Sequence, residues 1–364
     1  MMLSHHGFRP PASQSRSTLL AVAHRGVLMG QLPPAAAGRQ ADLFAETAAN
    51  DDAVAPPLPY PSTRRPQVAA FPADEEMASR LEETGRYRVL RQLVPRPVEP
   101  MPCPWPNGLK LGVLLDTETT GLNHATHEII ELGMVAFTYD DGGIRDVVGV
   151  FSGLRQPSQP ITAEITRITG ITDEMVRGQV IDLDVVERFI EPADLMIAHN
   201  ARFDRPFCEK LACGFDVKPW ACSVSEIDWT SLGFEGTKLG YLVGQVGLFH
   251  NGHRAVDDCH ALLEVLAGPS RVDGAVAPFA QLLVSAGRAR LRVHAVASPF
   301  HTKDVLKARG YRWADGSDGR PKCWWREVDE DAFDDEDLFL REEVYGGHSE
   351  AIVQRLTACE RFKA

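Results

Sequence analysis

An apolar run that ends in two carboxylates constrains this chain more than any other feature. Residues 111–115 read Leu-Gly-Val-Leu-Leu, which is typical of a strand buried on both faces of a sheet. Asp116 and Glu118 follow, and because strand side chains alternate, both point to one side while Thr117 points to the other. Adjacent acids repel and are costly to bury, so the pattern indicates either an exposed strand end or a divalent cation between them.

Strand and helix patterns alternate through residues 109–268. Three strand patterns come first in this block: 111–118, 128–140 and 145–154. Four helical patterns follow, at 182–190, 202–212, 237–247 and 256–268. One further strand pattern, at 193–200, lies between the first two of them. Three strands followed by alternating helices and strands predict one mixed α/β sheet with helices on both faces.

The flanking segments differ in composition from this block. Residues 1–73 are rich in Pro, Ala, Ser and Arg without sustained periodicity, which predicts a disordered tail; a targeting segment is the alternative. Residues 74–108 read as a helix and a Pro-rich linker. A small α+β module is predicted for 285–347, and a C-terminal tail for 348–364.

Two absences in the composition bear on the compartment of the protein. No apolar run reaches the ~18 residues that a membrane span needs. Seven cysteines make an odd number without a CxxC pair, which argues against a disulfide framework and favours a reducing compartment. We therefore expect a cytoplasmic protein without a membrane partner.

The net charge of −12 is unevenly distributed along the chain. Residues 109–268 hold 24 acidic and 12 basic side chains, whereas residues 269–328 hold 5 acidic and 11 basic ones. A protein that binds phosphate backbones could use metal ions in the acidic block and arginine or lysine side chains in the basic one.

Two further motifs supply the acids that a metal site requires. "HNARFD" places Asp204 in the first turn of a predicted helix, where an isolated aspartate more often caps the helix or offsets its dipole. "HRAVDD" places His253 in a loop and Asp258 one turn into the next helix, so both side chains lean toward one point. The neighbouring Asp257 is turned about 100° away from Asp258.

In this order, "DTETTGL", "HNARFD" and "HRAVDD" resemble the three motifs of the DEDD 3′–5′ exonucleases, histidine subgroup. That family includes the proofreading epsilon subunit of bacterial DNA polymerase III and RNA-trimming exonucleases. The resemblance covers about 109–268 and implies a ribonuclease H-like sheet. It also implies that four acids hold two Mg²⁺ or Mn²⁺ ions, with His253 as the general base: Asp116, Glu118, Asp204 and Asp258.

The residue types fit this chemistry. Hard divalent ions prefer carboxylate oxygens, and two such ions can activate water and stabilise the leaving oxygen of a phosphodiester. His253 lies in a predicted loop without a nearby acid in the sequence, so it can be neutral near pH 7 and accept a proton from water.

The resemblance further implies a set of contacts with the terminal nucleotide: Thr119, Thr120, Gly121, Leu122, Asn200 and Phe203. The Thr-Thr-Gly backbone would bring N–H groups close to the nucleotide. Leu122 would wedge against a base or belong to the core, and Phe203 would stack on a base or pack internally.

Two accessory features lie outside the acidic block. "QADLF" resembles the bacterial sliding-clamp-binding pentapeptide, with Gln40, Leu43 and Phe44 as clamp contacts, although a chance match is the alternative. The segment 307–328 interleaves basic residues with aromatic ones, which is typical either of a surface that holds single strands or of a small core built from Trp. The adjacent Trp324 and Trp325 should point to opposite faces.

The resemblance therefore implies a metal-dependent 3′–5′ exonuclease that releases nucleotides from single-stranded DNA 3′ ends, in replication proofreading or repair. An RNA-trimming exonuclease with the same active site is one alternative, because the motifs do not report sugar preference. A non-catalytic clamp-bound adaptor is a second alternative, against which the complete set of acids and histidine argues.

Overall fold

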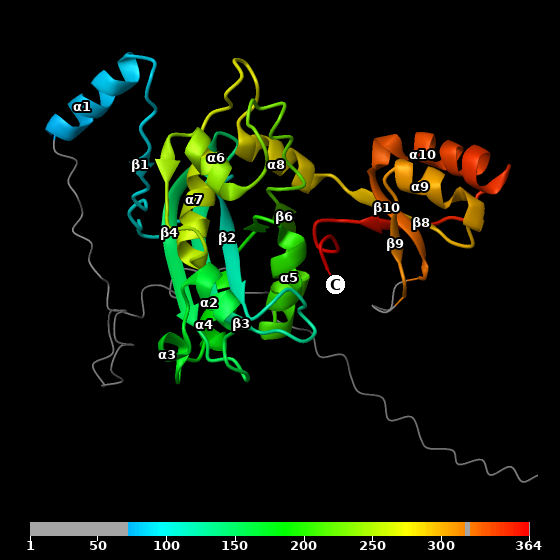
Figure 1. Ribbon diagram of the computed structural model, residues 1–364, viewed down its shortest axis with the longest axis horizontal. Helices are drawn as coiled ribbons and strands as arrows, with labels where there is room; N and C mark the ends of the chain where they lie inside the picture. Colours follow the sequence, from blue (N-terminus) through cyan, green and yellow to red (C-terminus); the bar gives the residue numbers. More distant parts are fainter. Residues whose placement is uncertain (1–71, 317–320, 364) are drawn as a thin grey trace, which may run out of the picture. The chain divides into compact units, whose positions relative to one another are not determined.

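The computed structural model describes residues 72–316 and 321–363 (Figure 1). A five-stranded mixed sheet with the order β4-β3-β2-β5-β6 forms the centre of the first part. Its strands are β2 (Lys110–Thr119), β3 (Ile129–Asp140), β4 (Gly143–Leu154), β5 (Leu195–Ala198) and β6 (Trp220–Cys222). β2 pairs antiparallel with β3 and parallel with β5, which confirms the mixed sheet predicted for this block.

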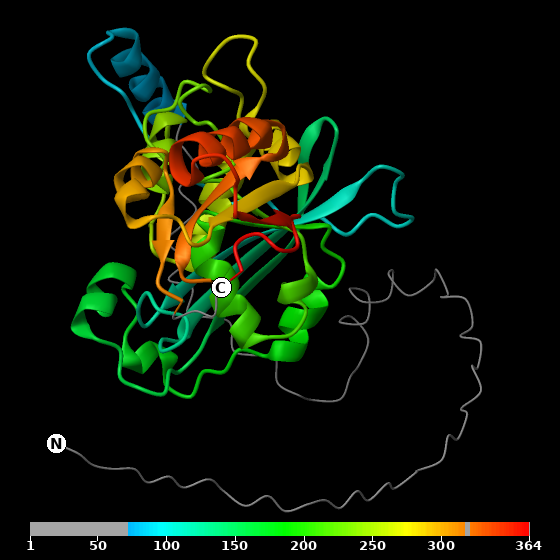
Figure 2. The same cartoon turned by 90° about the vertical axis from the view of Figure 1, so that its right-hand side faces the viewer.

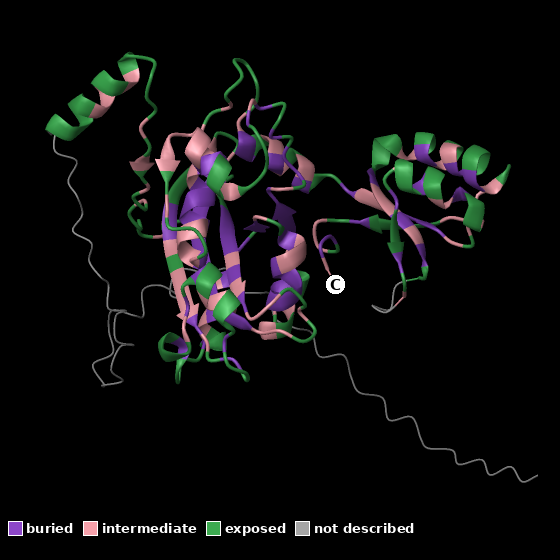
Figure 3. Cartoon of the chain, viewed as in Figure 1, coloured by how far each residue is buried: buried purple, intermediate pink, exposed green. Residues whose placement is uncertain are grey.

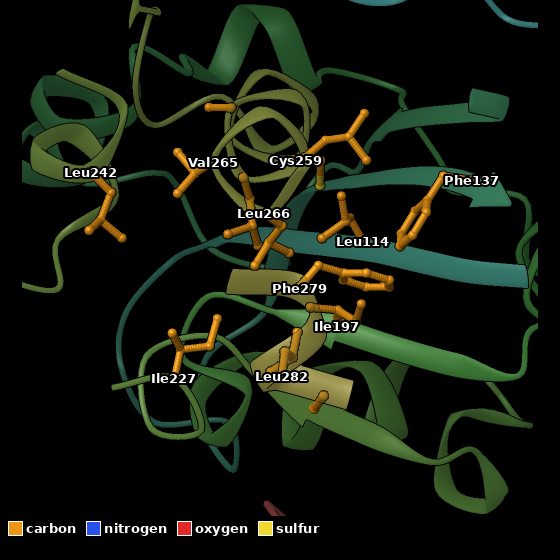
Figure 4. Packing of buried hydrophobic residues seen from close by; sticks show 14 of the residues in the cluster. Leu114, Phe137, Ile197, Ile227, Leu242, Cys259, Val265, Leu266, Phe279 and Leu282 are labelled. Carbon is orange, nitrogen blue, oxygen red and sulfur yellow. The ribbon is translucent and has the colours of Figure 1, made fainter. Parts of the chain in front are cut away.

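Helices cover both faces of this sheet. They are α2 (Ala163–Thr169), α3 (Asp173–Val176), α4 (Leu183–Ile190), α5 (Ala201–Leu211), the 3-10 helix η2 (Phe215–Val217), α6 (Leu239–Gln245), α7 (Ala255–Ala267) and α8 (Pro278–Gly287). One hydrophobic cluster joins Leu114 of β2 to Leu266 of α7 and Phe279 of α8, as Figure 4 shows. A second cluster on the other face joins Val113 to Phe207 of α5.

The apolar run before Asp116 owes its composition to this double burial. Val113 and Leu114 are both 0% exposed, and they belong to the two clusters on opposite faces of the sheet. Buried residues concentrate along β2 and α7 (Figure 3). A strand covered on both sides cannot alternate apolar with polar residues, so its pattern reads as a continuous apolar run.

The segment before the sheet is attached to it rather than free. After α1 (Pro72–Glu83), the short strand β1 (Arg91–Gln92) pairs in parallel with β7 (Leu248–Phe249). Arg96 forms an ion pair with Glu264 of α7 at 2.6 Å. The predicted linker thus runs along the sheet and its covering helix.

A second, four-stranded sheet has the order β11-β8-β10-β9. Its elements are β8 (Arg290–Ala295), the 3-10 helix η3 (Phe300–Thr302), α9 (Lys303–Ala308), β9 (Arg312–Ala314), β10 (Cys323–Asp329), the 3-10 helix η4 (Glu330–Ala332), α10 (Phe333–Phe339), the π-helix η5 (Leu340–Tyr345) and β11 (Ile352–Leu356). α9 and α10 lie over one face of this sheet (Figures 1 and 2). Val293, Leu306 and Val328 form the core between the two layers.

The C-terminal segment 348–364 differs from the tail predicted for it. β11 (Ile352–Leu356) pairs with β8 at the edge of the second sheet. The Trp220 backbone N–H donates to the Ala358 carbonyl at 2.9 Å, and Phe362 is 5% exposed within the cluster on the α5 face of the first sheet. Backbone pairing and one buried aromatic ring therefore order a segment whose composition looks like a tail.

Some predictions fall on residues that the structure does not describe. The pentapeptide Gln40–Phe44 and nearly all of the predicted tail 1–73 are among these residues, as is Arg320 of the basic and aromatic segment. Within the described parts of the chain, no helix combines the length and the hydrophobicity that a membrane crossing requires.

Candidate metal centre and active site

Three carboxylates converge at the C-terminal end of β2. One oxygen each from Asp116, Glu118 and Asp258 can be chosen so that all three atoms lie within 4.8 Å of one another. Asp116 and Glu118 share a face of β2, and Asp258 comes from the first turn of α7. This spacing of hard oxygen donors fits a divalent cation.

A glycine on β3 allows α7 to deliver Asp258. Gly133 is the register partner of Asp116. A Cβ at Gly133 would lie 2.3 Å from the backbone nitrogen of Val256 and 2.4 Å from the carbonyl carbon of Ala255. Only a residue without a side chain permits this close contact between the strand and the first turn of the helix.

A buried acid fixes the start of the same helix. Glu131 is 0% exposed, and its carboxylate accepts hydrogen bonds from the Arg254 guanidinium at 2.8 Å and from the Ala255 backbone N–H at 3.1 Å. The Arg254 backbone N–H in turn donates to Asp258 Oδ2 at 3.1 Å. Glu131 was read from the sequence only as part of a strand, and its spacing from the motifs carries no signal.

Asp204 is held at the C-terminal end of β2 by hydrogen bonds from Thr117. Its Oδ1 accepts hydrogen bonds from the Thr117 backbone N–H at 3.1 Å and from Thr117 Oγ1 at 2.8 Å. Asp204 is 2% exposed and does not belong to the three-carboxylate cluster, although its charge acts on Asp116. The structure thus brings all four predicted acids to one end of the sheet.

The electrostatics of this site favour a cation. Burial raises the pKa of Asp116 well above its ordinary value, and the charges of Asp204 and Asp258 raise it further. Burial, followed by the charge of Asp258, raises the pKa of Glu118 to about 8. Burial also raises the pKa of Asp204 to about 7, against the hydrogen bonds from Thr117. A bound divalent ion would offset both causes.

The two histidines near α7 occupy different environments. His253 is exposed in the loop before α7 with a left-handed φ of 65°, and within residues 72–316 and 321–363 it makes no hydrogen bond or ion pair. His250 Nε2, by contrast, lies 2.8 Å from Asp258 Oδ1. His250 was missed at the sequence level, although the spacing of "HNGH" was available as a signal.

The predicted nucleotide contacts on the β2 side are only partly available. The Thr120 backbone N–H donates to the Glu128 carbonyl at 2.9 Å, so it cannot donate to a nucleotide as predicted. Thr119 Oγ1 donates to the Gly121 carbonyl at 2.7 Å, which shapes the turn. Leu122 is 86% exposed, so the alternative that it belongs to the core is wrong.

The two nucleotide contacts predicted from the second motif, Asn200 and Phe203, lie in different environments. Asn200 is exposed at the N-cap of α5 with a left-handed φ of 86°, and its side chain makes no capping hydrogen bond. The Phe203 ring is half-buried, packs against the core cluster and lies 5.1 Å from the ring centroid of Phe207. Its packing role is therefore present in the structure, and base stacking by Phe203 stays a prediction.

Fold and site together define a nuclease-type carboxylate centre, and comparisons with known proteins agree. The family model described as Exonuclease matches residues 113–266. The DNA polymerase III subunit epsilon of Treponema pallidum is 34% identical over 161 residues, which are 41% of this chain and 72% of that protein. The chain belongs to the exonuclease family, and the resemblance drawn from its three motifs is confirmed.

Other relatives match a smaller share of their own length. The PolC-type DNA polymerase III of Clostridium perfringens is 34% identical over 160 residues, which are 42% of this chain and 11% of that protein. The chain thus spans about a tenth of these longer relatives. Among solved structures, "Exonuclease X in complex with 5′ overhanging duplex DNA" aligns with 24% identity and a TM-score of 0.37, covering 48% of this chain and 99% of that one.

Membership of the exonuclease family implies the use of divalent metal. The donors that such an ion requires are the carboxylates clustered at the end of β2. The ion itself and the number of ions bound are not fixed by the family or by this cluster.

Proposed function

We propose that this chain is a metal-dependent 3′–5′ exonuclease that hydrolyses the terminal phosphodiester of single-stranded DNA 3′ ends. The observation that carries the proposal is the convergence of Asp116, Glu118 and Asp258 within 4.8 Å, with buried Asp204 beside Asp116. Burial raises the pKa values of Asp116, Glu118 and Asp204, and groups with perturbed pKa values cluster at functional sites.

We infer that Asp116, Glu118, Asp204 and Asp258 hold two ions, Mg²⁺ or Mn²⁺. When bound, these ions supply a nucleophile derived from water and neutralise charge at the scissile phosphate. Thr117 orients Asp204 through two hydrogen bonds, which leaves the second oxygen of that carboxylate for ligation.

His253 is proposed as the residue that accepts the proton from water. It precedes Asp258 by five residues, and its exposed loop position lets the imidazole approach a substrate at the cluster. Catalytic groups are often loosely placed before substrate binds, so a His253 side chain without a hydrogen bond among the described residues fits this role.

DNA is the proposed substrate because the relatives at 34% identity are named as DNA polymerase III components. Proofreading or repair are the roles that such an activity serves. Trimming of RNA 3′ ends is the competing function, since the cluster acts on a phosphodiester that both nucleic acids share. The pentapeptide Gln40–Phe44 is proposed, from its sequence alone, as a sliding-clamp tether.

The full chain should be tested with 5′-labelled single-stranded DNA and RNA of one sequence. We expect a Mg²⁺-dependent ladder of products shortened from the 3′ end, with DNA degraded faster and EDTA abolishing the reaction. The variant Asp116→Asn should be inactive, whereas Asp141→Asn, which changes an exposed acid in the β3–β4 turn, should be fully active. Equal activity of Asp116→Asn and the unaltered chain would refute the proposal.

A further inference from the structure

The second sheet has one face that its own helices do not cover. Val293 of β8 and Val328 of β10 belong to the core between this sheet and α9. Trp325 lies on the opposite face of β10 from Val328. Its register partners are His294 on β8 and Arg312 on β9. The face opposite to α9 and α10 is therefore built around Trp325 and is rich in arginine.

Three guanidinium groups from the described part of the chain lie around the Trp325 ring on this face. The guanidinium carbons of Arg292, Arg202 and Arg312 lie 5.3, 5.5 and 6.0 Å from the ring centroid. Trp325 is only 7% exposed. Its ring therefore orients arginines by cation–π contact and is not available for stacking on a base, while stacking by other aromatic residues of the segment 307–328 stays a prediction.

A cavity of about 520 Å³ opens beside these arginines. Its lining includes the following donors: Asn200, Arg202, Arg290, Arg309, Arg312 and Arg326. Asn200 and Arg202 begin the same helix whose first turn carries Asp204, so one helix N-terminus contributes both to this cavity and to the carboxylate site.

The acids beside the cavity leave hydrogen-bond donors of its arginines available. Glu226, which also lines the cavity, pairs with Arg361. Arg309 and Arg326 share the single carboxylate of Glu336, at 3.3 and 2.9 Å. Glu327 is likewise shared between Arg202 and Arg292, at 3.3 and 2.8 Å. A guanidinium carries five N–H donors, so a shared carboxylate leaves both charge and donors for a further anion.

Two of the arginines that line the cavity are the most available to bind a further anion. Arg312 is exposed and forms no ion pair within the described part of the chain. Arg290 pairs with Asp329 through Nη2 at 3.6 Å, whereas its buried Nε has no acceptor among the described residues. A buried donor without a partner costs free energy, which a bound anion would recover.

We propose that this arginine-lined cavity binds the phosphate backbone of the single strand that leads to the carboxylate cluster. The inference rests on the proposed exonuclease function and adds the path of its substrate. Planar guanidinium groups match phosphate oxygens bidentately, and a strand carries one such anion per nucleotide. The block 109–268, with 24 acidic and 12 basic residues, repels that strand, so attraction must come from another surface.

Binding can be measured with the full chain carrying Asp116→Asn, so that the strand is not degraded. A long oligothymidylate and a long oligouridylate serve as probes over a range of salt concentrations. Arg312→Gln should weaken binding about 3- to 10-fold and lower the slope of log K against log salt by about 0.7, the value for one lost phosphate contact on a single strand. Arg341→Gln, which removes an exposed arginine of η5, is the matched control and should leave the slope unchanged.

The small substrate thymidine 5′-p-nitrophenyl phosphate separates this inference from the proposed function, because it reaches only the carboxylate cluster. In the otherwise unaltered chain, Arg312→Gln should hydrolyse it at the normal rate. If the unaltered chain does not hydrolyse it or any strand, the exonuclease proposal fails. Salt slopes that are equal for Arg312→Gln and its parent would overturn the cavity proposal alone. Arg312-dependent binding of an acidic polypeptide but not of either oligonucleotide would also overturn it, in favour of a protein partner.

Discussion

Removing one charge from the carboxylate cluster should stabilise the metal-free protein while destroying its metal site. Burial and the neighbouring acids raise the pKa of Glu118 from 4.5 to about 8. A carboxyl whose pKa is raised in the folded state is stable when protonated, so folding is favoured below pH 4.5 and loses free energy as pH rises toward 8. Glu118→Gln keeps the shape of the protonated acid and cannot ionise.

The size of the effect follows from the same pKa difference. The interval between 4.5 and about 8 corresponds to about 5 kcal/mol at 1.36 kcal/mol per pH unit. Water still reaches the half-buried carboxylate and screens its charge, so we expect Glu118→Gln to raise the free energy of unfolding by about 2–3 kcal/mol at pH 8. At pH 5, where Glu118 is mostly protonated in the folded protein, the gain should nearly vanish.

Urea unfolding in EDTA at pH 5 and pH 8 measures these differences, with Asp141→Asn as a control for loss of an exposed acid. Saturating Mn²⁺ should then reverse the order at pH 8. The unaltered chain gains free energy from binding the ion, whereas Glu118→Gln, with a weakened site, gains less. If Glu118→Gln were no more stable than the unaltered chain in EDTA at pH 8, the charge of Glu118 would not destabilise the metal-free protein, which would refute the prediction.

Three further outcomes are expected. His253→Ala should lower turnover by about 10²–10⁴-fold with little change in DNA binding, and an unchanged pH–rate profile would remove His253 from the mechanism. His250→Ala should weaken Mn²⁺ binding about 10-fold, because Asp258 loses a hydrogen bond that orients it, and calorimetry on the metal-free chain measures this. A peptide spanning Gln40–Phe44 should bind a bacterial sliding clamp, and substituting Gln40 and Phe44 by Ala should abolish the heat of binding.

The central sheet could be predicted because its signals are local. The run that ends at Asp116 is apolar on both faces, so burial and strand length are read together from one segment. β11 (Ile352–Leu356) could not be recognised in this way. It is an edge strand, four of its five residues are exposed, and pairing with β8 is what orders it. Its sequence therefore carries no periodic apolar pattern.

The same difference between local and non-local signals applies to the residues of the site. Asp116, Asp204 and Asp258 were found because each lies in a short motif, and the order of the motifs is informative. Glu131 acts through a contact with a residue that is far away in the sequence, at 3.1 Å from the Ala255 backbone N–H. His250 lies 2.8 Å from Asp258, which follows it by 8 residues. No local pattern reports the contact of Glu131, whereas the spacing of "HNGH" was an available signal for His250 that was missed.

The precision of the carboxylate centre depends on how closely a helix approaches a strand. Gly133 permits the backbone of α7 to lie against β3, and Glu131 on the same strand binds the first turn of that helix through Arg254 and Ala255. Because both anchors lie on β3 next to the β2 acids, Asp258 is set relative to Asp116 by sheet register and not by loop conformation. Carboxylates on rigid elements cannot move apart to relieve their repulsion. That repulsion therefore destabilises the metal-free protein, and binding of a divalent cation relieves it.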